Sequence, residues 1–225
     1  MPVFNEAQTI REILRRVDEA EAAGLEKELI VVDDGSTDGT AEMLSTLQPL
    51  RSPVQFLRHA QNRGKGAAIR TGLTAVSGDI VLIQDADLEY DPRDYPILLQ
   101  PLLNGLADVV YGNRFHGGPH RVLYFWHSLG NQVLTLLSNM ITNLNLNDME
   151  VGFKVFQSSL LQRVRIRSDR FGFEPEITVK VARLGARIYE VPISYHGRTY
   201  EEGKKITWKD GLAALYYLIR YRLAE

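Results

Sequence analysis

An unbroken aliphatic run at residues 80–83 passes directly into a group of acidic residues, and this junction constrains the fold more than any other feature of the chain. Consecutive apolar residues are typical of a strand buried on both faces, as in a parallel sheet. The acids that follow are Asp85, Asp87 and Glu89. Carboxylates this close repel one another unless a cation lies among them, and their oxygens suit a hard divalent ion such as Mg²⁺ or Mn²⁺. A solvated acidic turn is the alternative interpretation of an isolated D-x-D pair.

A second aliphatic run, residues 29–32, has the same design, because Asp33 and Asp34 follow it at once. In an open parallel α/β sheet the carboxyl ends of the strands lie along one edge, and ligands bind in the crevice there. We therefore expect the two acidic groups to face one pocket. The turn preference of Asp34-Gly35 and the helix-capping preference of Thr37 or Asp38 explain only part of this segment.

The chain alternates predicted helices and strands over its first half. A first helix, capped by Asn5, ends near Gly24. Expected strands then cover 29–32, 54–57, 80–83 and 108–111, with helices over about 38–47, 65–76 and 93–104. This alternation predicts βαβ units and a doubly wound, Rossmann-like, mostly parallel sheet with helices on both faces. Beyond Arg114 we expect helices over 121–146, 174–184 and 207–223, and strands near 154–156 and 188–195.

Composition and missing motifs exclude several classes of protein. With 225 residues, 44% of them hydrophobic, the chain is long enough for one domain with a proper core. A net charge of −2 argues against general nucleic-acid binding. The absence of cysteine excludes disulfides and thiolate chemistry and is compatible with a reducing cytoplasm. No signal peptide and no run of 18 apolar residues is recognisable, so we expect no spanning helix.

The segment Gly64-Lys65-Gly66 is the nearest approach to a nucleotide-binding fingerprint. Ile69 stands where G-x-G-x-x-G needs its third glycine, and the chain contains neither a P-loop nor an H-E-x-x-H motif. The segment predicts a helix start. Glycine amides beside a lysine at such a start are equally suited to hold an anion.

Six segments, in this order, resemble the GT-A glycosyltransferases of family 2, in the branch of the dolichol-phosphate mannose synthases and related polyprenyl-phosphate glycosyltransferases. They are residues 2–6, 32–40, 62–66, 84–89, 112–115 and 148–154. The resemblance covers almost the whole chain. It implies one GT-A domain, in which 1–114 bind the nucleotide sugar, 115–205 bind the acceptor and 206–225 form an amphipathic helix. The family's first strand normally precedes Pro2, so we expect a natural start further upstream or a first strand cut short.

Carried over by position, the resemblance implies three groups of site residues. The donor-binding group lines the nucleobase, ribose and nucleoside side, and comprises Pro2, Phe4, Glu6, Val32, Asp34, Lys65 and Asp85. Asp87 and Glu89 hold Mg²⁺ or Mn²⁺, although relatives often carry Gln where this chain has Glu89. The acceptor-phosphate group is His120, Arg121, Arg198 and Lys205. Catalytic roles fall to Asp87, Arg114 and Arg198, and the resemblance implies that both arginines contact the donor and acceptor phosphates.

The reaction that the resemblance implies is a metal-dependent, inverting transfer of a hexose from a donor of the GDP-mannose or UDP-glucose type to a polyprenyl or dolichyl phosphate. The second pKa of a phosphate monoester is about 6, so such an acceptor is largely anionic at neutral pH and needs no general base. Arginine presents a planar fork that suits phosphate oxygens. Which sugar and base the protein uses, and its oligomeric state, stay open at this stage.

Two segments suggest contact with a lipid surface. Residues 115–126 mix aromatic side chains with histidine and arginine, and the helix expected over 207–223 carries one apolar face beside Lys209, Arg220 and Arg222. This pattern suits a membrane interface, so we expect peripheral attachment to the cytoplasmic face of the membrane. Packing of the same face against the domain is the alternative.

Three other functions also stay open. A D-x-D-G-T phosphatase would need an acid where Gly35 stands, so this function is disfavoured. The motifs also suit a non-catalytic subunit that binds sugar nucleotides, and a family 2 transferase with a non-lipid acceptor.

Overall fold

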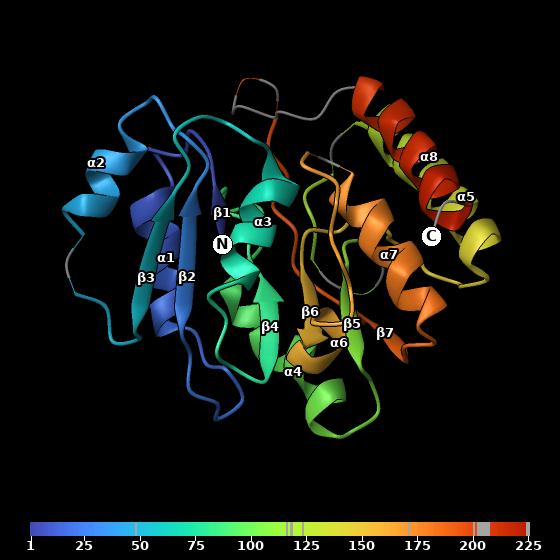
Figure 1. The fold of residues 1–225 in the computed structure, drawn as a ribbon, viewed down its shortest axis with the longest axis horizontal. Coiled ribbons are helices and arrows are strands. Elements are labelled where there is room, and N and C mark those ends of the chain that lie inside the picture. Colours follow the sequence, from blue (N-terminus) through green and yellow to red (C-terminus); the bar gives the residue numbers. More distant parts are fainter. Residues whose placement is uncertain are drawn as a thin grey trace.

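The computed structural model describes residues 1–47, 49–115, 117, 119–122, 124–170, 172–199, 201 and 208–223. Within these residues the strands form two sheets with helices on both faces (Figure 1). The first sheet is parallel, in the order β1 (Pro2–Val3), β2 (Leu29–Asp33), β3 (Val54–Arg58). The second has the order β4 (Ile80–Ile83), β6 (Lys154–Gln157), β5 (Val109–Asn113), β7 (Ile188–Pro192).

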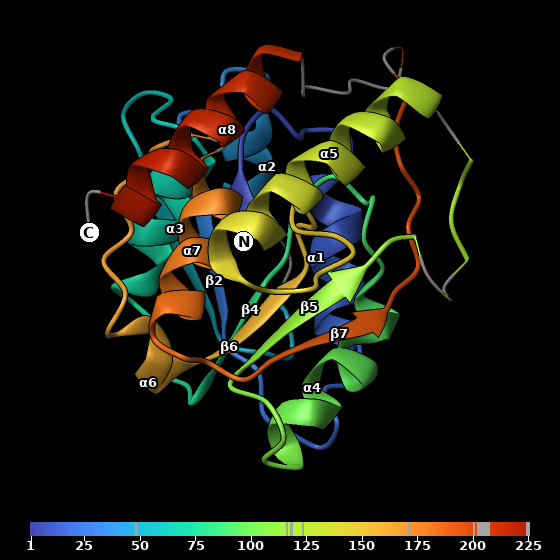
Figure 2. The same ribbon diagram turned by 90° about the vertical axis from the view of Figure 1, so that its right-hand side faces the viewer.

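Helices α3 (Lys65–Leu73) and α7 (Phe173–Arg183) cover one face of the sheets, and α1 (Ile10–Glu19) and α4 (Tyr95–Leu103) cover the other (Figure 2). Helices α5 (Phe125–Thr142) and α8 (Trp208–Leu223) lie side by side outside α7. The short helices are α2 (Thr40–Ser45), which packs on α1, the 3₁₀ turn η1 (Pro92–Asp94) and α6 (Ser158–Leu161). None of the helices in the described part of the chain has the length and apolar composition needed to cross a membrane.

Strand β6 departs from the parallel arrangement, because it runs antiparallel to both β4 and β5, whereas β5 and β7 are parallel. The amide of Gly112, near the end of β5, donates to the carbonyl of Phe153, just before β6. The chain therefore enters β6 at the edge where β5 ends, so β6 has to run back. In strand direction the second sheet is mostly parallel, as predicted, and β6 is its reversed strand.

The apolar face of α1 is as expected, with Ile10, Ile13, Leu14 and Val17 buried at spacings of three and four. Fully burying each such side chain contributes about 1.5–3 kcal/mol. The predicted cap was wrong, because α1 begins at Ile10 and Asn5 lies well before it. Asn5 has a φ of 52°, and its Oδ1 accepts a hydrogen bond of 2.9 Å from the amide of Thr37, so it joins two loops.

Candidate active site

Asp34, at the end of β2, organises the start of α3. Its Oδ1 lies 2.6 Å from His59 Nδ1 and accepts a 2.9 Å hydrogen bond from the amide of Arg63. Its Oδ2 accepts a 2.6 Å hydrogen bond from the amide of Gly64, whose φ of 103° favours glycine. Asp34 is therefore held on several sides within the protein, and its contact with a nucleobase stays a prediction.

Lys65, the first residue of α3, connects the acidic segment after β4 to α7. Its Nζ lies 2.9 Å from Asp85 Oδ1 and 2.9 Å from Glu174 Oε1. Burial opposes the charge of this ammonium, but the two carboxylates outweigh burial and raise the pKa of Lys65 above its usual value. Asp34 and Asp85 thus bind adjacent residues at the start of α3, which brings the two acidic groups to one region as expected.

Arg198 lies among three carboxylates from three parts of the chain. Its Nη2 is 3.0 Å from Asp87 Oδ2, and its Nη1 is 3.4 Å from Glu6 Oε2. Its Nε is 3.5 Å from Glu89 Oε1, an ion-pair separation without hydrogen-bond geometry, and its backbone amide donates to the same oxygen at 2.9 Å. These carboxylates raise the pKa of Arg198 against the opposing effect of burial. The carboxylates of Glu6, Asp87 and Glu89 thus form an acidic centre, and the guanidinium of Arg198 is the cation that occupies it.

The crowding of these carboxylates changes the pKa of Asp87. Burial, followed by the charges of Glu89 and Asp85, raises the pKa of Asp87 to about 7, even with Arg198 alongside. In the described part of the chain no group of three His, Asp or Glu side chains is arranged so that it could hold a metal ion. The chemistry still fits a hard cation, because the oxygens of Asp87 and Glu89 converge on one positive charge. Their assignment as metal ligands stays a prediction.

Arg114, just after β5, is held differently. Its Nε and Nη2 each lie 2.6 Å from one oxygen of the buried Asp148, and Nη2 also donates to Asn131 Oδ1 of α5 at 3.1 Å. The guanidinium carbon lies 5.2 Å from the centre of the Tyr195 ring. One carboxylate therefore occupies the fork of Arg114, and phosphate contact by this residue stays a prediction.

Tyr195 connects the acidic centre to the segment that leads into α5. Its hydroxyl donates to Glu89 Oε2 at 3.0 Å, and its carbonyl accepts from the amide of Arg121 at 2.9 Å. His120 forms a β-bridge with Tyr195. The sequence predicted that this helix begins near residue 121. These backbone bonds explain why α5 begins at Phe125 instead. His120 and Arg121 therefore lie beside the residue that bonds Glu89, and their contact with an acceptor phosphate stays a prediction. Lys205 lies outside the described residues.

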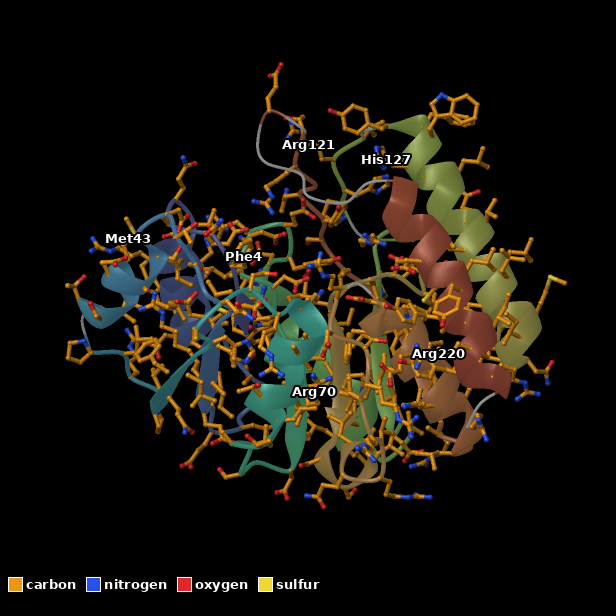
Figure 3. All side chains as sticks on the ribbon, turned by 45° about the horizontal axis from the view of Figure 1, so that its top comes forward. Phe4, Met43, Arg70, Arg121, His127 and Arg220 are labelled. Atoms are coloured by element: carbon orange, nitrogen blue, oxygen red, sulfur yellow. The ribbon has the colours of Figure 1, made fainter. Side chains whose placement is uncertain are left out.

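The other expected donor residues gather at the edge of the first sheet. Pro2 pairs with Val32 across β1 and β2, and Glu6 belongs to the Arg198 centre. Phe4 follows β1 and is half-buried (Figure 3). Val32 is only 1% exposed, so its side chain packs within the protein and cannot line an open donor surface in this structure.

Sequence reasoning missed the buried charges beneath this region. Lys154 donates to the carbonyls of Met149 and Val151, and burial lowers its pKa. Burial and the neighbouring Glu174 raise the pKa of Glu150, whose Oε1 has no hydrogen-bond partner. The segment 148–154 carried a signal as a motif. Glu174, by contrast, stands in no recognised motif.

A surface cavity of about 540 Å³ lies elsewhere, between α3 and the segment after α6. Arg70, Arg165 and Arg167 line it, together with Asp169 and apolar side chains. It contains none of the acidic residues expected to bind the donor. We therefore place the candidate site at the carboxylates and not at this cavity.

Comparison with known proteins gives a consistent result. Residues 1–165 match the family described as "Glycosyl transferase family 2". The chain is 28% identical to a dolichol-phosphate mannosyltransferase of Pyrococcus furiosus, over 91% of this chain and 57% of that protein. It is 30% identical to an undecaprenyl-phosphate mannosyltransferase of Micrococcus luteus, over 91% of this chain and 85% of that protein. The chain thus spans little more than half of the archaeal relative.

Solved structures share the fold. A glucosyl-3-phosphoglycerate synthase from Mycobacterium tuberculosis, crystallised with Mn²⁺, UDP and glucosyl-3-phosphoglycerate, superposes with a TM-score of 0.74 at 24% identity. The match covers 99% of this chain and 78% of that one. The expected GT-A architecture is confirmed.

Proposed function

Since this chain belongs to glycosyl transferase family 2, we propose that it transfers a hexose from a nucleoside-diphosphate sugar to a polyprenyl phosphate at a membrane surface. Its relatives include a dolichol-phosphate and an undecaprenyl-phosphate mannosyltransferase. The observation that carries the proposal is the junction between the acidic centre and an exposed, uncharged helix face.

That helix face belongs to α5, whose 18 residues include no Asp, Glu, Lys or Arg. The exposed apolar side chains of α5 form a stripe. Trp126, which is 77% exposed, lies at one end of it, and Met140, which is 73% exposed, lies at the other. Its members recur at spacings of three and four, which places them along one side of the helix. The stripe and the segment that leads into α5 together comprise Val122, Tyr124, Phe125, Trp126, Leu129, Val133, Leu136 and Met140. Exposed apolar surface of this extent is typical of an interaction site.

Helix α8 extends this face. Tyr216 and Ile219 are exposed, whereas Ala214, Leu218 and Tyr221 are buried against the domain. One side of this helix therefore packs against the domain, and we propose the other side for the membrane. The side chains of Trp208 and Leu212 lie outside the described residues. Arg220 and Arg222 in its last turn suit anionic headgroups, each worth about 1 kcal/mol near a membrane. We propose peripheral attachment to the cytoplasmic face through α5 and α8.

The apolar face reaches the acidic centre through hydrogen bonds. Arg114 bonds Asn131 on α5, and Tyr195 bonds both Glu89 and the segment that enters α5. Arg121 and His127 lie at one end of the α5/α8 pair and Arg220 at the other (Figure 3). A lipid phosphate held beside α5 would therefore approach the end where Arg121 lies.

Asp87 and Glu89 would hold a divalent ion, which when bound neutralises the charge of the leaving diphosphate. The protein's own cations have the remaining task, because donor diphosphate and acceptor phosphate repel each other. Arg121 and Arg198 are placed to offset that repulsion, and an already anionic acceptor oxygen attacks without a protein base. Attack opposite the leaving group inverts the anomeric centre.

The test is a transfer assay with GDP-mannose and with UDP-glucose, each with Mn²⁺ and a short polyprenyl phosphate, read by mass spectrometry of the lipid. We expect a glycosylated lipid with one of the donors. The controls are EDTA and the corresponding polyprenol without its phosphate. Donor hydrolysis or transfer to a water-soluble acceptor, without lipid product, would contradict the lipid assignment. Nucleotide binding without any turnover would support a non-catalytic subunit instead.

A preceding thermal-shift screen of nucleoside diphosphates with Mn²⁺ identifies the base, because a ligand that binds the native state raises the melting temperature by mass action.

A further inference from the structure

The guanidinium of Arg198 lies where a cation bound by Asp87 and Glu89 would have to lie. Asp87, Glu89 and Glu6 all direct oxygens at it, from 3.0 to 3.5 Å. Two of these acids are the residues expected to hold the divalent ion. Arg198 therefore neutralises the site in the form of the protein described by this structure.

The pairing is imperfect for an arginine. A guanidinium binds one carboxylate best through two parallel hydrogen bonds. Arg198 spreads over three acids, and its buried Nε has no hydrogen-bond partner among the residues that the structure describes. A small divalent cation matches such converging oxygens better and carries twice the charge. The same oxygens cannot bind the guanidinium and the divalent cation at once. Two cations a few ångströms apart repel each other by several kcal/mol at the effective dielectric of a protein surface.

We propose that Arg198 and the divalent cation are alternative occupants of one carboxylate site, so that metal binding expels the Arg198 side chain. The inference deepens the proposed function and rests on it for the identity of the metal site. Expulsion has a consequence for the order of events. Arg198 becomes available to an incoming phosphate only after the cation has entered, so the cationic partner for the acceptor appears once the donor site is charged.

The test measures Mn²⁺ binding without nucleotide or lipid, by electron paramagnetic resonance of the free ion. Arg198→Ala removes the competitor, and we expect it to bind Mn²⁺ at least about tenfold more tightly than the unaltered protein, given the size of the repulsion removed. Arg198→Gln keeps a hydrogen-bond donor for Asp87, and we expect the same direction of change. It guards against loss of folding in the alanine variant.

Arg187→Ala is the matched control, because Arg187 also pairs with a carboxylate, Asp108, but at an exposed position. It should leave Mn²⁺ affinity unchanged. A second readout uses the unaltered protein: saturating Mn²⁺ should speed the reaction of Arg198 with phenylglyoxal, followed by peptide mapping.

Unchanged Mn²⁺ affinity in both Arg198 variants, no measurable Mn²⁺ binding by any form, or a phenylglyoxal rate unaffected by Mn²⁺ would each overturn the inference. A tighter variant combined with no lipid product would keep the inference and refute the lipid acceptor.

Discussion

Arg114 and Arg198 were both expected to contact phosphate, yet the protein holds them in opposite ways. Arg114 makes two 2.6 Å contacts with a single buried carboxylate, Asp148. Arg198 is shared among three acids at 3.0 to 3.5 Å. A fork filled by one partner fixes the guanidinium, whereas a cation shared by several acids can be exchanged. The comparison motivates two predictions: that Arg114 maintains the architecture of the site and that Arg198 takes part in its chemistry.

The largest effect should come from the acid that faces Arg198. Asp87→Asn removes an expected metal ligand, and we expect transfer to fall by about a thousandfold, the upper end of the range for losing one preorganised electrostatic group. The fold should persist, because the substitution relieves repulsion with Glu89 and Asp85. Transfer kinetics and melting temperature test this together. Near-normal transfer in this variant would refute the metal assignment.

The corresponding change at Arg114 should affect folding instead. Arg114→Ala leaves Asp148 as a buried, unpaired carboxylate, which costs about 3–5 kcal/mol in typical proteins. We expect a loss of that order in the free energy of unfolding, measured by denaturant titration. Arg187→Ala, which breaks an exposed pair, should lose far less stability. If Arg114→Ala is as stable as that control, the contrast between the two arginines fails.

The two substrates should separate the roles of Arg198. We expect Arg198→Ala to lower kcat/KM for the lipid phosphate by about a hundredfold, equivalent to about 2.7 kcal/mol. The dissociation constant of the free nucleoside diphosphate should change far less. An equal loss in both measurements would place Arg198 at the donor diphosphate, and no loss would make it a structural cation.

The sequence was informative where one segment determines a feature locally. The aliphatic runs before Asp33 and Asp85 predicted buried strands that end in acids, and both strands are present. The strand over 80–83 is buried only at Ile83, and its other side chains are half-buried. Lys65 was correctly placed at a helix start. Three-dimensional partners were not predictable, because nothing local to Lys65 points to Glu174, and nothing local to Arg198 points to Glu6. The reversal of β6 was missed for the same reason, since the edge at which a long connection re-enters a sheet is not encoded in the strand.

The smallest effect concerns a carboxyl in the neighbourhood of Arg114. Burial, followed by the charge of Glu174, raises the pKa of Glu150 from 4.5 to about 8. Between these two values the folded protein retains a proton that the unfolded chain has lost, so stability falls as the pH rises through this window. Glu150→Gln removes the titration. We therefore expect the variant to be more stable than the unaltered protein at pH 8, with the difference shrinking as the pH falls towards 4.5.

Urea titrations of both proteins between pH 4.5 and pH 8 measure the difference directly, since other titrating groups cancel in the comparison. Glu12→Gln is a suitable control, because the pKa of that exposed carboxyl is lowered by hydrogen bonds from Arg15 and Arg16. The stabilisation that its ionised form contributes is lost only as the pH falls from 4.5 towards about 2, so the Glu12→Gln difference should stay nearly constant over most of the measured range. A Glu150→Gln difference that is constant with pH would mean that Glu150 is ionised throughout the range. Lys154, whose charge lowers the pKa of Glu150 more than that of Arg114 does, would then be its cationic partner.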